Sequence, residues 1–391
     1  MAAPPASAHP LHAQVHGAGP TGCLAALALA NAGWTVTIAD PLSAAQLGNR
    51  SRAYAFNHSS QQLLDQLGLW GELEPLMVPF RQLQLRDQAL DGAVPFGVAD
   101  LPPRCRRTAG QAVGWIGLHA PLMAVLLERL AGHPAIATRL GAAAAPGTPP
   151  ERQPDLVVAA DGPASPQRQA LGIGLWHFTY RQSCLTAQVE LRGSPPDQAW
   201  ELFRPEGPFA VLPLGGQRFQ LVWSGPASRC RQLESLAPVA FLDRLAGALP
   251  EALQPDALLD QPRAFPVALL LARRLAKGRT VLLGESGHRC HPVGGQGLNL
   301  CWRDVAALHR LAQRVAAGRL QSEQLPARYA RQRWPDLLLT LLATDLLVRL
   351  FSNRHRLLLP LRRLALGLLG RSAPLRRLSL GAMTLGPCRP W

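Results

Sequence analysis

The sequence feature that most limits how this chain can fold is a glycine-rich turn near its N-terminus. Residues 12–16 predict a strand that runs into GAGPTG, in which Gly17, Gly19 and Gly22 fit the spacing GxGxxG. An alanine- and leucine-rich helix follows, and TVTIAD predicts a second strand that ends on Asp40. GxGxxG alone is a weak signal, but strand, glycines, helix, strand and acid in this order are typical of a dinucleotide-binding unit.

The positions of the helix N-terminus and of Asp40 indicate where each part of a dinucleotide would bind. The helix N-terminus after Gly19 and Pro20 offers unpaired N–H groups and a partial positive charge, so we expect the pyrophosphate of a dinucleotide there. Asp40 lies at about the spacing that places a carboxylate on an adenosine ribose hydroxyl. The alternative interpretation is a glycine-rich turn followed by a solvated aspartate.

A second strand-to-helix turn occurs at residues 280–304, TVLLGESGHRCHPVGGQGLNLCWRD. An apolar run predicts a buried strand that stops at Gly284, and a helical pattern begins near Gly297. Gly294 and Gly295, with Gly297, would let a flat ligand approach the backbone, and the helix N-terminus would favour negative charge on it. The alternative is a tight turn with no ligand.

Composition sets the outer limits. The chain has 391 residues, 48% of them hydrophobic, and a formal net charge of +15 that is almost entirely arginine, a skew that genomic base composition could also explain. Its seven cysteines form no CxxC pair, which favours a reducing compartment over a disulfide or zinc framework. The start lacks a secretion-signal pattern, and no apolar stretch reaches 18 residues without a charge, so we expect no membrane-spanning helix.

The remaining segments predict a divided α/β fold. Arg52 stands just before an amphipathic helix, Asp91-Gly92 marks a hairpin, DLVVAADG is a buried strand ending on Asp161, and residues 176–223 alternate like an antiparallel sheet. We therefore predict a Rossmann-like dinucleotide-binding domain with an inserted antiparallel-sheet substrate domain and a helical C-terminal appendage. The predicted dinucleotide-binding parts are 1–79, 105–175 and 265–335; a hairpin at 80–104 joins the substrate domain, 176–264, and the appendage is 336–391.

Several motifs together carry a family resemblance. GAGPTG with Asp40, RAYAFN near residue 52, ADGPASPQR at 160–168 and LLGESGHRCHPVGGQGLN at 282–299 resemble the flavin-dependent aromatic hydroxylases of the p-hydroxybenzoate hydroxylase fold. WELFRPEGPFAVLPL (200–214) and YARQRWPDLLLTLLATDLLVRLFSN (329–353) narrow it to the hydroxylases of ubiquinone biosynthesis and their relatives. The resemblance implies FAD, NADH or NADPH as reductant, and insertion of one oxygen atom from O2 into a ring through a flavin C4a-hydroperoxide.

The resemblance also assigns roles to residues. Arg52 and Asp161 would hold the cofactor and the approach of the nicotinamide, and Glu285 stands where the family has an aspartate. The N–H groups near Gly297, Leu298 and Asn299 would stabilise negative charge on the reduced ring. Phe209 and Leu212 are pocket candidates, although a core role is the stronger interpretation for both. The predicted cofactor site comprises Gly17, Gly19, Pro20, Gly22, Asp40, Arg52, Asp161, Gly284, Glu285, Gly295, Gln296, Gly297, Leu298 and Asn299, and the predicted catalytic loop positions are Pro292, Gly294 and Gly297.

Two other site types are not favoured. His288, Cys290 and His291 lie close in sequence, but a zinc site needs about four ligands and no partner cluster is evident, so we predict no metal. The excess arginine is not interleaved with aromatics in a nucleic-acid-binding pattern, so we predict no nucleic-acid partner.

The C-terminal stretch favours a membrane surface. From Arg349 to the end the chain has nine arginines and no acidic residue, interleaved with leucine runs, and two short helices broken near residues 370–374 would show a leucine face and an arginine rim. The alternative is a helical cap on the cofactor domain with a solvated basic face, and the two are compatible. We expect a cytoplasmic protein peripherally associated with the inner face of a membrane.

These patterns together predict an FAD-dependent monooxygenase that hydroxylates the aromatic ring of a polyprenylated phenol or quinone precursor, with a quinone-biosynthesis complex as a further partner. Two enzyme alternatives are a hydroxylase of a small soluble aromatic and a flavin reductase of isoprenoids. A third alternative is a non-catalytic flavin-fold subunit of a quinone-synthesis complex.

Overall fold

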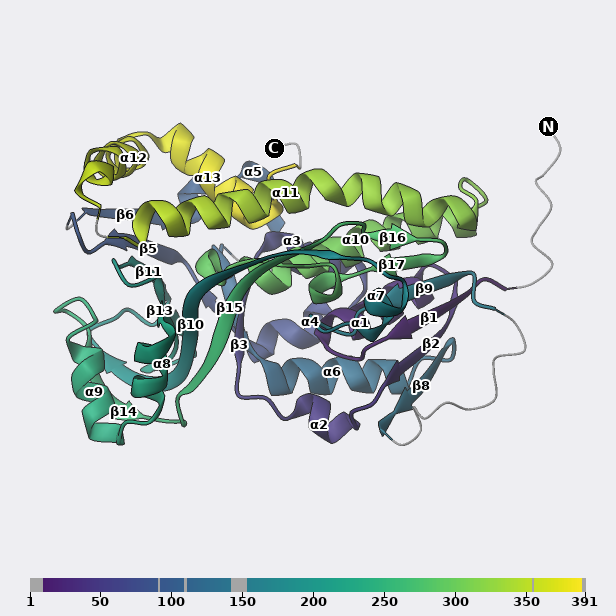
Figure 1. The fold of residues 1–391 in the computed structure, drawn as a ribbon, viewed down its shortest axis with the longest axis horizontal. Coiled ribbons are helices and arrows are strands. Elements are labelled where there is room, and N and C mark those ends of the chain that lie inside the picture. The colour runs from purple at the N-terminus through teal and green to yellow at the C-terminus, as the bar shows by residue number, and fades with distance from the viewer. Residues whose placement is uncertain (1–9, 91, 109–110, 142–152, 354, 389–391) are drawn as a thin grey trace.

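The computed structural model describes residues 10–90, 92–108, 111–141, 153–353 and 355–388. Figure 1 shows a mixed sheet packed with helices on one side, a second sheet with its own helices on the other, and a long helix that crosses above both. Two long strands, β10 and β15, run from one side of the molecule to the other (Figure 1). The predicted combination of a Rossmann-like domain, an inserted antiparallel sheet and C-terminal helices is confirmed.

The first sheet has six strands, and all neighbours are parallel except β16 and β17. Residues Leu156–Ala159 and Thr280–Leu282 form largely apolar, mostly buried strands, as expected where helices cover a parallel sheet. The strands His12–His16 and Thr35–Asp40 instead alternate between buried and partly buried residues. Helices α1 and α10 pack against each other, and α6 packs on α1. In spatial order the strands are β16 (Ala276–Lys277), β17 (Thr280–Leu282), β9 (Leu156–Ala159), β1 (His12–His16), β2 (Thr35–Asp40) and β8 (Ile136–Leu140), and the helices are α1 (Pro20–Asn31), α6 (His119–Ala131) and α10 (Gln296–Ala316).

The second sheet has nine strands and is largely antiparallel; one of its neighbouring pairs, β5 with β11, is parallel. Alternating residues of its strands pack with helices α8 (Ala227–Glu234) and α9 (Pro238–Ala246) in a separate core. Its strands are β18 (His288–Arg289), β15 (Arg263–Ala272), β10 (Leu175–Arg192), β13 (Arg218–Pro226), β12 (Phe209–Pro213), β11 (Gln198–Phe203), β5 (Gln82–Asp87) and β6 (Gly92–Gly97), and β14 (Gln254–Leu258) pairs with β10. The predicted hairpin is present as β5 and β6, although Asp91 lies outside the described residues.

A small three-stranded sheet corrects one expectation. Arg52 does not directly precede the amphipathic helix, because Ala53–Phe56 forms strand β3, and helix α3 (His58–Gln66) begins only after Asn57. The Asn57 side chain accepts hydrogen bonds from Ser59 N and Ser60 N, which fixes the helix start there. The other strands of this sheet are β4 (Met77–Phe80) and β7 (Gly114–Leu118), and the remaining short helices are α2 (Ala44–Gly48), α4 (Trp70–Leu73), α5 (Pro103–Thr108) and α7 (Pro166–Ala170).

Three helices form the C-terminal region: α11 (Leu325–Phe351), α12 (Leu359–Arg371) and α13 (Ala373–Leu385). The break expected at residues 370–374 is present between α12 and α13. The domain boundary expected at residue 336 falls inside α11, which continues through Pro335. Among the described helices, none combines the length and the hydropathy that crossing a bilayer requires.

Candidate active site

The turn between β1 and α1 is packed on one side and open on the other. Gly17 has φ +98°, and a Cβ there would lie 2.4 Å from Ala160 O on the neighbouring segment. A Cβ on Gly22 would lie 1.8 Å from Gly17 O, so helix and loop touch. At Gly19 a Cβ would meet nothing within 4 Å, so the backbone faces open space at the start of α1. Pro20 opens this helix, where a missing N–H costs nothing.

Asp40, at the end of β2, faces this turn. Its Oδ2 accepts a hydrogen bond from Ala18 N at 2.7 Å, and its Oδ1 accepts one from Leu42 N at 2.8 Å. The carboxylate is therefore held at the edge of the glycine turn, and each oxygen keeps acceptor capacity for a hydroxyl.

The turn between β17 and α10 contains three glycines in the left-handed region. Gly284 has φ +62°, and the adjacent Gly294 and Gly295 have φ +66° and +61°, which side-chain-bearing residues rarely adopt. Helix α10 begins at Gln296, so the N–H groups of its first turn point out of the helix without intrahelical partners. A Cβ on Gly297 would meet nothing within 4 Å, which leaves this helix end accessible.

Asn299 fixes this helix end in place rather than facing a ligand with its side chain. Its Oδ1 accepts hydrogen bonds from Asn57 N at 3.0 Å and Ser60 Oγ at 2.6 Å. Its Nδ2 donates to Ala55 O at 2.7 Å and Gly295 O at 2.8 Å. Since both donors and two acceptor positions are used within the protein, this side chain orients the backbone around it.

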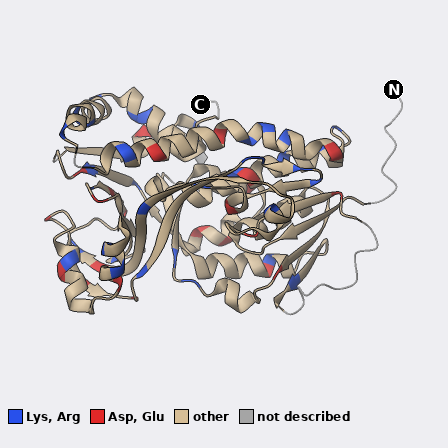
Figure 2. Ribbon diagram, in the orientation of Figure 1, with Lys and Arg blue, Asp and Glu red and all other residues tan. Residues whose placement is uncertain are grey.

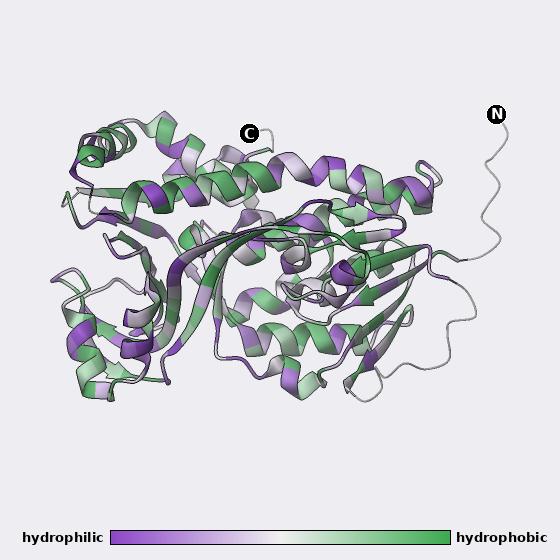
Figure 3. Cartoon of the chain, viewed as in Figure 1, coloured by the Kyte–Doolittle hydropathy of each residue, from purple (hydrophilic) through white to green (hydrophobic). Residues whose placement is uncertain are grey.

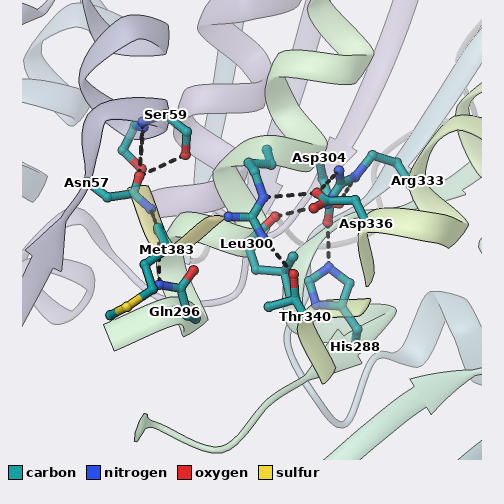
Figure 4. Close-up of polar contacts among 12 residues, drawn as sticks. Asn57, Ser59, His288, Gln296, Leu300, Asp304, Arg333, Asp336, Thr340 and Met383 are labelled. Atoms are coloured by element: carbon teal, nitrogen blue, oxygen red, sulfur yellow. Dashed lines mark hydrogen bonds and ion pairs between the residues drawn. The ribbon is translucent and has the colours of Figure 1, made fainter. Parts of the chain in front are cut away.

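Helix α13 closes the same region from the C-terminal side. Met383 O accepts hydrogen bonds from Asn57 Nδ2 at 2.8 Å and from Gln296 Nε2 at 3.1 Å, as Figure 4 shows. The C-terminal helices are therefore part of the site's wall.

The histidines of the loop are held by protein groups. His288 Nε2 lies 2.6 Å from Asp304 Oδ2, and His291 Nε2 lies 3.3 Å from Gln182 Oε1. Burial lowers the pKa of His291 to about 3. Within the described ranges, no group of three or more His, Cys, Asp or Glu side chains could hold a metal ion.

A cavity of about 500 Å³ lies over the α10 N-terminus. Leu212 contributes to its wall, whereas Phe209 is fully buried in the core of the second sheet. The predicted residues that line it are Arg52, Glu285, Pro292, Gly294, Gly295, Gln296, Gly297, Leu298 and Asn299. The remaining predicted residues, Gly17, Gly19, Pro20, Gly22, Asp40, Asp161 and Gly284, are not part of its lining.

Two predicted polar residues have different surroundings. Asp161 Oδ2 accepts a hydrogen bond from Gln167 N at 3.1 Å, while its Oδ1 is buried without a hydrogen-bond partner among the described residues. Glu285 is partly exposed, with its Oε1 3.6 Å from Arg289 Nε. An orphaned buried carboxylate oxygen at Asp161 fits a site that a bound hydroxyl or N–H would complete.

Sequence reasoning missed Glu201, on strand β11. Its side chain is 8% exposed, lines the cavity, and accepts a hydrogen bond from Gly294 N at 3.3 Å. Burial raises its pKa to about 7, against the opposing effect of that hydrogen bond. The available signal was its position on the strand: it lies two residues from Ala199 and two from Phe203, which are apolar and occupy the same face.

Comparison with known proteins decides the family. The family described as FAD binding domain matches residues 12–88 and 143–336. The chain belongs to the FAD-dependent monooxygenases. A protein of Rhodospirillum rubrum called ubiquinone hydroxylase UbiL is 34% identical over 96% of this chain and 90% of its own length. The 3-demethoxyubiquinol 3-hydroxylase of Escherichia coli is 29% identical over 95% of this chain and 97% of its own length.

Solved structures of other proteins share the fold. The p-nitrophenol 4-monooxygenase PnpA of Pseudomonas putida has a TM-score of 0.76 and 18% identity, over 97% of this chain and 99% of its own. Klebsiella pneumoniae HpxO, solved with FAD and uric acid, has a TM-score of 0.73 and 19% identity, over 97% and 98%.

The residues of this FAD-dependent monooxygenase fit its cofactor. The open backbone at Gly19 and the acceptor capacity of Asp40 suit a pyrophosphate and a ribose, and Gly297 leaves room for a flat ring at the α10 N-terminus. These groups are the ones that would hold FAD.

Proposed function

We propose that this FAD-dependent monooxygenase hydroxylates the aromatic ring of a polyprenylated phenol or quinone precursor, with NADH or NADPH as reductant and O2 as the oxygen source. The named relatives from Rhodospirillum rubrum and Escherichia coli support ubiquinone biosynthesis as the setting. When bound, FAD would supply the redox chemistry that activates O2, as the family resemblance implies.

The chain's own residues would position and shield this chemistry. The free N–H groups at the start of α10 would stabilise negative charge beside the flavin ring, and Pro292 and Gly294 would border the substrate ring. The apolar walls of the cavity would exclude water from the reacting atoms.

One observation carries the substrate class. The cavity extends from the α10 N-terminus to the C-terminal helices, where Leu346, Leu347 and Leu369 line it. Leu346 is also 64% exposed, so this lining residue reaches the protein surface. A ring at the flavin and a long apolar chain leaving past Leu346 would occupy both ends of such a cavity. A small soluble aromatic would leave the leucine end empty.

The surface around that end supports a membrane contact. Exposed leucines lie on all three C-terminal helices, which carry hydrophobic residues among hydrophilic ones in Figure 3, and basic residues occur along them in Figure 2. They are Leu338, Leu339, Leu342 and Leu346 on α11, Leu361, Leu364 and Leu368 on α12, and Leu375 and Leu378 on α13. We call these nine side chains the leucine surface.

Only part of the basic charge is available to lipid. Arg362 is buried and donates to Leu350 O at 2.6 Å, and Arg376 donates to Asp100 Oδ1 at 3.0 Å, so both hold the helices to the protein. Arg356, Arg363, Arg371 and Arg377 are exposed. The proposed membrane contact would thus share one region with the cap, and Arg356, Arg363, Arg371 and Arg377 would offer guanidinium groups to anionic lipid.

Gene deletion in the host, with mass spectrometry of the extracted quinones, tests the proposed function. We expect accumulation of a prenylated ring that lacks one hydroxyl, and its disappearance when the parent gene, but not the Gly19→Val gene, is restored. An unchanged quinone profile, or accumulation of an unprenylated aromatic, would contradict it. Restoration by a variant that binds no FAD would favour the non-catalytic role.

A further inference from the structure

Glu201 occupies an unusual position in the cavity wall. On β11 it lies between Ala199 and Phe203 on the face that lines the cavity. Its direct cross-strand neighbours are Leu85 on β5 and Ala210 on β12, both of which also line the cavity. A carboxylate has therefore been placed in an apolar wall, where an unpaired charge is costly.

The protein provides only part of the stabilisation that this carboxylate needs. Oε2 accepts one hydrogen bond, from Gly294 N at 3.3 Å, and Oε1 has no hydrogen-bond partner among the described residues. No ion pair of Glu201 occurs in the described part of the chain. A carboxylate has about four acceptor positions, so Glu201 retains most of its acceptor capacity.

Other titratable groups lie on elements around the cavity. The loop contributes Glu285, His288, Arg289 and Cys290, the β3 segment contributes Arg52 and Tyr54, α10 contributes Cys301, and Cys184 lies on β10. None of these determines the ionisation of Glu201: its pKa of about 7 results from burial, opposed by the Gly294 N–H. Glu201 is thus free to gain or lose a proton near neutral pH.

The bond to Gly294 places Glu201 beside the loop over which the flavin ring would lie. Gly294 belongs to the loop that leads into the α10 N-terminus, and Gly294 and Pro292 both line the cavity. A substrate ring seated in the cavity beside that loop would face the Glu201 carboxylate.

We propose that Glu201 is a catalytic residue that binds the hydroxyl of the substrate ring and accepts its proton during hydroxylation. This inference rests on the proposed function, because only a phenolic ring has such a hydroxyl. The ring O–H would donate to a Glu201 carboxylate oxygen. As the O–H bond breaks and a Glu201 O–H bond forms, the electron pair on the ring oxygen delocalises to the ortho and para carbons.

This transfer serves the reaction and leaves Glu201 unchanged overall. Ortho and para carbons are the positions that an electrophilic oxygen atom attacks. After that attack the attacked carbon loses its proton to the second oxygen atom of O2, which leaves as water with the electrons that NADH or NADPH supplies. The ring becomes aromatic again, and Glu201 returns its proton to the original ring oxygen. The carboxylate is then ready for the next substrate.

The test compares a phenol with its methyl ether. The FAD-loaded parent protein, Glu201→Gln and Glu201→Asp would each be titrated with a short-chain prenylated phenol and with the same compound methylated on the ring oxygen. Binding would be followed by the flavin absorbance, and kcat and KM would be measured from pH 5.5 to 9. Glu251→Gln, at an exposed position outside the cavity lining, is the matched control.

The parent protein should bind the phenol about ten- to a hundredfold more tightly than the ether, as expected for a hydrogen bond to a charged group. Glu201→Gln should lose most of this preference, lower kcat more than it raises KM, and lose the rise in rate as pH passes through about 7. Glu201→Asp should recover part of each effect.

Three results would overturn the proposal in distinguishable ways. If the parent hydroxylates the phenol and Glu201→Gln matches it in preference and pH profile, Glu201 only supports the Gly294 loop. If the parent binds the phenol without preference over the ether, no group accepts the hydroxyl. If the parent binds neither compound, the proposed function fails together with this inference.

Discussion

The Asp304 carboxylate lies with Oδ2 2.6 Å from His288 Nε2, and this contact joins the loop between β17 and α10 to helix α10 itself. The same Oδ2 accepts a hydrogen bond from Gly284 N at 2.9 Å, and Oδ1 accepts one from Arg333 Nε at 2.6 Å. Figure 4 shows that Arg333 also reaches Asp336, on the same helix, α11. One buried carboxylate therefore holds the end of the β17 strand, the loop and the C-terminal helix together.

The first prediction is that Asp304→Asn strongly destabilises the protein. Removing one partner from a buried charged network costs about 3–5 kcal/mol, because the remaining charges stay buried. Denaturant unfolding measures this loss, with the exposed Asp243→Asn as control. Equal midpoints for Asp304→Asn and the parent would contradict the importance of the network.

The same carboxylate gives an acid signature. Burial alone would raise the Asp304 pKa, but His288 and Arg333 outweigh it and lower the value to about 2. A lowered pKa contributes stability above the unfolded value, near 3.8, and this contribution is lost as pH falls toward 2. We expect the parent protein, but not Asp304→Asn, to lose this contribution over that window.

The second prediction concerns Glu201, whose raised pKa affects stability with the opposite sign to the lowered pKa of Asp304. Because burial raises the Glu201 pKa from 4.5 to about 7, ionised Glu201 destabilises the fold, and this penalty grows as pH rises through that window. Glu201→Gln should therefore stabilise the protein, by about 2 kcal/mol more at pH 8 than at pH 5. Thermal unfolding of both proteins at the two pH values measures the difference. A pH-independent effect would show that the site solvates this carboxylate.

Sequence reasoning pointed to those parts of the candidate site that depend on local chain geometry. Gly19, Gly294 and Asp40 were identifiable because a glycine turn, or an acidic residue at the end of a strand, can be recognised from a short stretch of consecutive residues. The role of Asn299 was not, since its four partners come from residues 55–60 and Gly295. Glu201 was missed for the same reason. Its hydrogen bond to Gly294 joins residues 93 positions apart, which only the tertiary fold brings together.

The C-terminal helices show a similar limit. Leucine runs and arginines predicted two short helices with a basic rim, and the helices are present. The sequence could not separate Arg362, which is buried against carbonyl groups, from Arg363, which is exposed. The two arginines are neighbours on α12 and point in different directions, and the packing of the helix decides which one is buried.

The third prediction concerns Gly19. Its φ of −69° and ψ of 178° are available to valine, and a Cβ would meet no protein atom within 4 Å, so Gly19→Val should fold normally. The new side chain would fill the space at the α1 N-terminus that the FAD pyrophosphate would occupy. We therefore expect the variant to bind no FAD and to be colourless. Flavin absorbance after purification and circular dichroism check both points. Gly71→Val, equally open, should remain yellow, and a yellow Gly19→Val protein would contradict the pyrophosphate assignment.

The fourth prediction concerns Glu285. Glutamate keeps the charge of the family's aspartate at this strand end, and we expect it to accept a hydrogen bond from an FAD hydroxyl. Loss of such a bond to a charged group should weaken FAD binding about ten- to a hundredfold in Glu285→Ala, with a smaller effect in Glu285→Asp. Since Glu285 Oε1 lies 3.6 Å from Arg289 Nε, Arg289→Gln controls for the lost ion pair. Equal FAD affinities of the parent and Glu285→Ala would show that the contact is absent here.

The last prediction separates the membrane contact from the cap. Deleting the C-terminal helices would be ambiguous, because Met383 O also holds Asn57 and Gln296 at the α10 N-terminus, where the flavin would lie. Replacing Leu361, Leu364 and Leu368 by glutamine changes only exposed side chains of α12. Each leucine that enters the lipid interface should contribute about 1 kcal/mol or more, so the triple variant should bind vesicles at least about tenfold more weakly.

Two comparisons make this result specific. The matched control replaces Leu76, Val239 and Leu259, which are exposed outside the C-terminal helices, and should bind vesicles like the parent. Replacing Arg363, Arg371 and Arg377 by glutamine should weaken binding to anionic vesicles and reduce its salt dependence, because those charges would no longer meet lipid head groups. Flotation of the parent, the leucine variant, the arginine variant and the control decides the question. If all four float equally, the leucine surface does not contact lipid, and the helices serve only to close the flavin site.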